Sequence, residues 1–164
     1  MYKHILAALD GSPRAPQVLR HAADLAARSG AVLHLVRAVT VPVGVPDDSW
    51  VLNAADLTSR MLAHGGEDLG RLAADLHPHV TPIRWGERVV RLGPPAPTIT
   101  DVARELGADL VVIGSHGYGL LDRILGTTAS RVVHHAPCNV MVVRVDDAAA
   151  VAADKPPAAA GQPA

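Results

Sequence analysis

The sequence predicts an α/β fold, a single doubly wound domain in which a five-stranded parallel sheet carries helices on both faces. Short apolar runs, typical of strands covered on both sides, alternate along the chain with segments whose apolar residues recur at helical spacing. The 164 residues, 49% of them hydrophobic and 19% charged, supply one core of ordinary size. Strands and helices in this alternation form right-handed βαβ units, which build an open parallel sheet.

The first three elements have clear signals. Lys3–Leu9 is almost unbroken in apolar residues, which predicts a central strand. Ser12 as N-cap and Pro13 at the first helical position predict the start of a helix whose apolar spacing continues until Gly30. Ala31–Ala38 then predicts a second strand covered on both faces.

The next segment contains a long helix preceded by a loop. Prolines and a glycine predict a loop over Val41–Ser49. Apolar spacing predicts a helix over Leu52–Leu76, closed by Pro78. The adjacent Gly65 and Gly66 weaken this helix and favour a kink.

The following strand is predicted to lie at an edge of the sheet. Val80–Leu92 is rich in β-branched residues, but Pro82 and Gly86 suit an edge position better than a central one. A short helix over Ile99–Leu106 and a covered strand over Leu110–Ile113 follow.

The last predicted elements complete the open sheet. A glycine-rich loop is predicted over Gly114–Leu125, a helix over Thr127–Pro137 and a final strand over Val140–Val145. Asp146–Ala164 is mostly Ala, Pro, Gly and Asp without periodicity, which predicts a disordered tail. The expected domain, residues 1–145, is therefore one Rossmann-like unit.

Composition excludes several functional classes. Aromatic residues make up 2% of the chain and Phe is absent, so stacking platforms for single-stranded nucleic acid are missing. A formal charge of −1 provides no basic field for nucleic acid or for an anionic membrane. The lone Cys138 suits a reducing compartment, and the apolar run Ile5–Leu9 is too short for a signal peptide or a membrane span, so we expect a cytoplasmic protein.

Two loops should carry the chemistry. Ligands of doubly wound sheets bind beyond the carboxyl ends of the strands where strand order reverses, which predicts a site at Asp10–Ser12 and Gly114–Gly119. Glycines that let backbone amides approach an anion, followed by Gly126, Thr127 and Thr128 at a helix start, outline a phosphate cradle. Spacing alone equally fits an ordinary strand-to-helix loop with capping threonines.

Two common nucleotide motifs are absent, because no Gly-Lys-Ser/Thr and no Gly-x-Gly-x-x-Gly occurs. Another combination is present, and its segments are Tyr2–Leu6, Asp10–Ser12, Leu33–Val36, Gly107–Gly117 and Val132–Arg144. This combination resembles the universal stress protein family over about Met1–Val145. The nucleotide-binding members of that family carry the motif Gly-x2-Gly-x9-Gly-Ser/Thr.

The resemblance implies ATP as ligand, and Mg²⁺ could accompany it. The implied contacts are Asp10 and Val36 around the nucleoside, Ile113, Gly114 and Gly117 beside ribose and phosphate, and Gly126, Thr127 and Thr128 at the phosphates. One departure is that eight residues, Tyr118–Leu125, separate Gly117 from Gly126 where the motif has nine. The shorter loop either moves away from the phosphates or is compensated by the additional Gly119.

Other polar residues have weaker signals. Asp10 either contacts the ligand or Mg²⁺, or caps the first helix alongside Ser12. The nine histidines, His116 and the adjacent His134 and His135 among them, show no spacing that defines a metal site. Ser12 and Ser115 have no spacing-defined His and Asp partners for hydrolase chemistry. Cys138 is expected to be a small packed residue rather than a redox sensor.

The resemblance also implies a homodimer in which the final strands pair, and the apolar Val140–Val145 strand at a sheet edge supports it. The function expected is a nucleotide-responsive stress or regulatory protein, with at most slow ATP hydrolysis. One alternative is a family member that binds no nucleotide and acts through dimerisation and protein partners. An adenylyl- or phosphoryl-transfer enzyme ranks third, because neither a His-x-Gly-His nor a Ser-Gly-Gly signature occurs.

Overall fold

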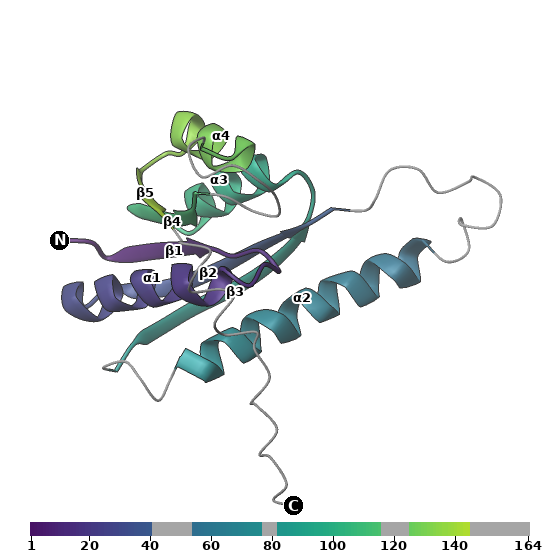
Figure 1. Ribbon diagram of the computed structural model, residues 1–164, viewed down its shortest axis with the longest axis horizontal. Helices are drawn as coiled ribbons and strands as arrows, with labels where there is room; N and C mark the ends of the chain where they lie inside the picture. Colours follow the sequence, from purple (N-terminus) through teal and green to yellow (C-terminus); the bar gives the residue numbers. More distant parts are fainter. Residues whose placement is uncertain (41–53, 77–81, 116–124, 145–164) are drawn as a thin grey trace, which may run out of the picture.

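The computed structural model describes residues 1–40, 54–76, 82–115 and 125–144. Strands and helices alternate along these ranges, as Figure 1 shows. The elements are β1 (His4–Ala8), α1 (Ala15–Ser29), β2 (Val32–Val39), α2 (Ala54–Leu76), β3 (Arg84–Leu92), α3 (Pro95–Glu105), β4 (Leu110–Gly114), α4 (Thr127–His135) and β5 (Asn139–Val143). The predicted loop at 41–49 and tail at 146–164 lie outside the described residues.

The five strands form one parallel sheet in the order β3-β2-β1-β4-β5. Strand order therefore reverses at β1, which pairs with β2 on one side and β4 on the other, as the sequence predicts. In Figure 1, α1 and α2 lie on one side of the sheet and α3 and α4 on the other. The predicted doubly wound α/β fold is confirmed.

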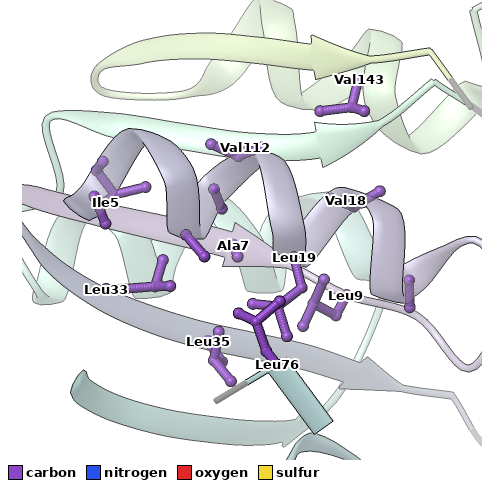
Figure 2. Close-up of a cluster of buried hydrophobic side chains, with 14 of the residues drawn as sticks. Ile5, Ala7, Leu9, Val18, Leu19, Leu33, Leu35, Leu76, Val112 and Val143 are labelled. Atoms are coloured by element: carbon purple, nitrogen blue, oxygen red, sulfur yellow. The ribbon is translucent and has the colours of Figure 1, made fainter. Parts of the chain in front are cut away.

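Each face of the sheet has its own core. Figure 2 shows side chains of β1, β2, β4 and β5 meeting α1 and α2 in the first cluster. The second cluster joins the opposite sheet face to α3 and α4 through residues such as Leu6, Val36, Val111, Val102 and Val132. Alternate residues of each central strand thus face opposite cores, which explains their continuous apolar sequences.

α1 begins later than predicted. Its N-cap is Arg14, the proline of its first turn is Pro16, and Ser12 belongs to the preceding turn. At its other end Gly30 adopts φ 66°, the left-handed conformation that favours glycine at a helix C-terminus.

α2 runs as one continuous helix through the adjacent Gly65 and Gly66, and Figure 1 shows no break in it. Gly65 faces the sheet, where an added Cβ would lie 2.8 Å from Val90 Cγ1, whereas one added at Gly66 would meet nothing within 4 Å. Gly65 therefore permits close packing of α2 on β3.

α3 begins at Pro95, earlier than the predicted Ile99, because prolines are accepted in the first turn of a helix. β3 is an edge strand, as predicted, and β5 is the opposite edge. Within the residues that the structure places, no helix combines the length and apolar character needed to cross a bilayer.

Candidate nucleotide site at the carboxyl edge

Most of the predicted site residues that the structure describes lie near the carboxyl ends of three neighbouring strands. Ala8 of β1 pairs with Val36 of β2 and with Ile113 of β4 in the parallel ladders. The segments that follow β1 and β4 therefore leave the sheet side by side. This is the reversal point at which ligands of doubly wound folds bind.

Asp10 lies two residues beyond β1 and is exposed. Its Oδ1 accepts a hydrogen bond from the backbone N–H of Ser12 at 3.1 Å and from the Ser12 hydroxyl at 2.6 Å. Arg14 N–H donates to the same hydroxyl at 3.4 Å. One carboxylate oxygen thus organises the turn into α1, while Oδ2 makes no hydrogen bond within the described ranges.

Val36 is fully buried and belongs to the core against α3 and α4. Its carbonyl oxygen accepts a hydrogen bond from Leu9 N–H at 2.9 Å, which extends the β1–β2 ladder beyond Ala8. Ile113 is also buried in this core, and Gly114 is partly exposed. The side chains of Val36 and Ile113 therefore belong to the apolar core below the candidate site and offer no polar contact to a ligand.

The start of α4 is tied to the end of β4. Ser115 N–H donates to Val143 O at 2.8 Å, and Gly126 N–H donates to Ser115 O at 2.8 Å. Thr127, the first residue of α4, is exposed, and Thr128 is partly buried. The N-terminus of a nine-residue helix is thereby held at the carboxyl edge of the sheet.

The N–H groups that the start of α4 can offer to a phosphate differ from those that the family resemblance implies. The Gly126 amide is occupied by Ser115, and no side chain caps α4 in the part of the chain that is described. The backbone amides of Thr127 and Thr128 stand in the first turn, where N–H groups have no intrahelical acceptor and the helix dipole favours anions. Gly117, the remaining site residue, lies outside the described residues.

Two residues that organise the edge were not assigned this role from sequence. Ser12 fixes Asp10, and the Asp-x-Ser spacing of an Asx turn is the signal that could have identified it. Ser115 connects β4, β5 and α4 through backbone groups, for which no side-chain pattern exists.

The other polar residues considered from the sequence form neither a metal site nor a reactive thiol in the part of the chain that is described. His134 Nδ1 lies 2.7 Å from Ser130 O on α4, and the described residues contain no group of three or more His, Cys, Asp or Glu able to hold a metal ion. His116 lies outside the described ranges. Burial raises the pKa of the partly buried Cys138 thiol, and the negative charge of Asp109 raises it further. Both effects favour the unreactive thiol over the thiolate.

Comparison with known proteins agrees with this geometry. The model of the universal stress protein family matches residues 1–144. Universal stress protein A homolog 1 of Coxiella burnetii is 31% identical over 143 residues, covering 87% of this chain and 96% of that protein.

Solved structures show the same fold. Universal stress protein UspA from Lactobacillus plantarum superimposes with a TM-score of 0.73 at 29% identity, covering 87% of this chain and 98% of that one. The universal stress protein from Archaeoglobus fulgidus, solved in complex with dAMP, has a TM-score of 0.50 at 26% identity, with 86% and 97% covered. The chain described here belongs to the universal stress protein family.

Proposed function

We propose that this protein binds an adenine nucleotide, ATP with Mg²⁺, at the carboxyl edge between β1 and β4. The observation that carries the proposal is the start of α4, whose first-turn amides have no side-chain cap and which Ser115 holds at the carboxyl end of β4, the strand paired with β1. The exposed Asp10 follows β1 at this same edge of the sheet. The Archaeoglobus fulgidus relative in complex with dAMP supports an adenine nucleotide as the ligand class.

The residues of the proposed site would contact different parts of the nucleotide. The amides of Thr127 and Thr128 and their hydroxyls would donate to phosphate oxygens. Asp10 would accept hydrogen bonds from the nucleoside or hold Mg²⁺ through water by its open Oδ2. Val36, Ile113 and Gly114 would bound the site from below.

The role proposed with this site is regulatory. Nucleotide occupancy would stabilise the edge loops and so report the nucleotide state of the cell, consistent with a stress-response protein. No more than slow hydrolysis is proposed. A cytoplasmic location fits the unpaired thiol of Cys138.

Substitution of Thr127 tests the phosphate contact. Thr127→Asp places a negative charge beside the phosphates, and we expect ATP affinity to fall at least about tenfold, a loss of about 1.4 kcal/mol. Because acidic residues stabilise helix N-termini by about 0.3–1 kcal/mol, the fold should not weaken. Thr127→Asn, which has the same shape as Asp without the charge, is the matched control. The affinities of both variants for ATP with Mg²⁺ are measured by calorimetry. Equal affinities would show that the phosphates do not bind at the start of α4.

A second function has specific support. The use of the Gly126 amide by Ser115 removes one phosphate donor that the resemblance implies. The spacing of eight residues between Gly117 and Gly126 is also one residue shorter than that of the family motif. A member that binds no nucleotide would act through dimerisation and protein partners. Mass spectrometry of small molecules released when the purified protein is denatured separates the two functions, since only the first yields an adenine nucleotide.

A further inference from the structure

Two histidines meet at the opposite end of the sheet from the proposed nucleotide site. His4 begins β1, and His34 stands near the beginning of β2, where its side chain is 6% exposed. His4 Nδ1 and His34 Nε2 lie 3.2 Å apart, and the rings stack with centroids separated by 5.5 Å. A buried histidine paired with a second, partly exposed one requires an explanation, because histidine is the side chain that changes charge near neutral pH.

The pair adjoins a bulge between β2 and the edge strand β3. Leu33 pairs with Trp85 and Leu35 with Arg88, so two residues of β3 stand opposite His34 alone. The second of them, Glu87, donates its backbone N–H to His34 Nδ1 at 2.9 Å. A side chain thus replaces the ladder hydrogen bond that the bulge removes.

The bulge is fitted to the imidazole ring. A Cβ added at Gly86 would lie 2.4 Å from His34 Nδ1 and 2.7 Å from Val32 Cγ1. Real Cβ atoms do not approach other atoms so closely, so glycine is required for the ring to reach the Glu87 amide.

These contacts determine where the protons are. Because His34 Nδ1 accepts from Glu87, the neutral ring carries its proton on Nε2 and donates it to His4 Nδ1. His4 then carries its own proton on Nε2. The same tautomer argues against a metal between the rings, since a metal on His34 Nε2 would require the proton on Nδ1, facing the Glu87 N–H.

One added proton breaks this arrangement. A proton on His4 Nδ1 faces the Nε2 proton of His34, and moving the latter to His34 Nδ1 places it against the Glu87 N–H. Each placement therefore costs one of the two hydrogen bonds and puts a positive charge on or directly beside the buried His34 ring.

We propose that His4, His34 and the Gly86–Glu87 bulge form a pH-sensitive latch that fastens β3 to β2 while both rings are neutral and releases the bulge on protonation. The ligand of this site is a proton. The latch lies apart from the nucleotide site and does not depend on it.

The surrounding charges agree with this behaviour. Burial lowers the pKa of His34, and the neighbouring His4 lowers it further, whereas the Glu87 carboxylate opposes both. The Asp109 carboxylate accepts from the backbone amides of Lys3 and His4. Three other cationic side chains of β3 and α3 contact their own acceptors: Arg84 with Gly30 O, Arg91 with Glu105, and Arg104 with Asp101. Arg88 is a further charged residue of β3, beside the bulge.

The direction in which stability changes with pH follows from the number of protons that the folded and unfolded chains bind. A folded-state pKa below the unfolded value of about 6.5 means that the unfolded chain binds more protons between the two values. The contribution of His34 to stability is therefore complete above about pH 6.5 and is lost as the pH falls toward the lowered pKa.

Nuclear magnetic resonance of the full ¹⁵N-labelled chain tests the latch directly. At pH 7.5 the imidazole spectra should show His34 protonated on Nε2 only, and its titration midpoint should lie below 6.5. The Glu87 amide resonance should shift with the same midpoint. A His34 ring protonated on Nδ1 at pH 7.5, or a Glu87 amide that does not follow the titration, would overturn the proposal.

A substitution separates the latch from general acid sensitivity. Asn at position 34 keeps an acceptor near the place of Nδ1 and cannot titrate, so His34→Asn should flatten the loss of unfolding stability between pH 7 and 5. His21→Asn, at an exposed ring on α1, is the matched control and should leave that loss unchanged. A His34→Asn profile as steep as that of the unaltered protein contradicts the latch. Should this variant not fold, His4→Asn, which should raise the His34 midpoint, decides the question.

Discussion

The Asp10 carboxylate has two separable tasks. Its Oδ1 accepts hydrogen bonds from the backbone and side chain of Ser12 and so shapes the turn into α1. Its charge is exposed at the carboxyl edge, where the ligand is proposed to bind. An amide side chain retains the first task but not the charge, whereas a methyl group retains neither.

Substitutions at Asp10 should therefore differ in stability but agree in binding. Asp10→Ala leaves two Ser12 donors without their acceptor, and we expect the free energy of unfolding to fall by about 1–2 kcal/mol. Asp10→Asn should cost less than about 0.5 kcal/mol, yet both variants should lose affinity for ATP with Mg²⁺. Chemical unfolding and calorimetry measure the two effects, and equal stability of the two variants would show that the turn does not depend on the acceptor.

Close packing of α2 on the sheet depends on one glycine of this helix. Gly65 lies against Val90 of β3. Nearby, Asp68 of α2 hydrogen-bonds to Arg37 of β2 and to Arg71 of its own helix. Although burial acts to raise the pKa of Asp68, the hydrogen bond from Arg37 and the adjacent positive charges bring it below its ordinary value.

Adjacent glycines in α2 should respond to alanine with opposite signs. Gly66→Ala meets open space and should raise the free energy of unfolding by about 0.5–1 kcal/mol through helix propensity. Gly65→Ala gains the same propensity but forces its Cβ into the stiff Val90 side chain, at a cost of about 1–3 kcal/mol. Thermal or urea unfolding of the pair provides the comparison. A stabilised Gly65→Ala variant would show that α2 does not pack closely on β3.

The edge strand β5 is the surface proposed for homodimer formation. Val143 is 3% exposed and belongs to the α1 core, so a charge there would damage the fold and could not report on an interface. Met141 is 37% exposed on the same strand, which makes it the better probe.

The unaltered protein should have twice the chain mass of 17.1 kDa in light scattering at micromolar concentration. Met141→Lys should yield monomers with unchanged secondary structure, because the ammonium group would be buried between paired strands. Val133→Lys, at an exposed position on α4, is a control of equal charge. A monomeric mass for the unaltered protein would refute the dimer.

The fold of the molecule can be predicted from the sequence wherever the local residue pattern agrees with the tertiary structure. β1, β2 and β4 were recognised because burial on both faces produces continuous apolar sequences. The start of α1 was misplaced because Ser12 binds Asp10 instead of capping the helix. The pairing of Gly126 with Ser115, and of His34 with a bulge 53 residues away, arises from long-range contacts that no local pattern encodes.

Removal of residues 146–164 tests the predicted domain boundary. The segment has no periodic apolar face, so the truncated chain should keep its thermal midpoint to within about 2 °C. Differential scanning calorimetry of both chains measures this. A clear decrease would show that the segment packs on the domain and that the boundary is misplaced.

Binding of ATP with Mg²⁺ to the unaltered full-length protein is the most direct test of the proposed function. Isothermal titration calorimetry should show saturable heat for one site per chain, with a dissociation constant below about 1 mM. The absence of heat, together with an unchanged thermal midpoint at millimolar ATP, would contradict nucleotide binding at the carboxyl edge.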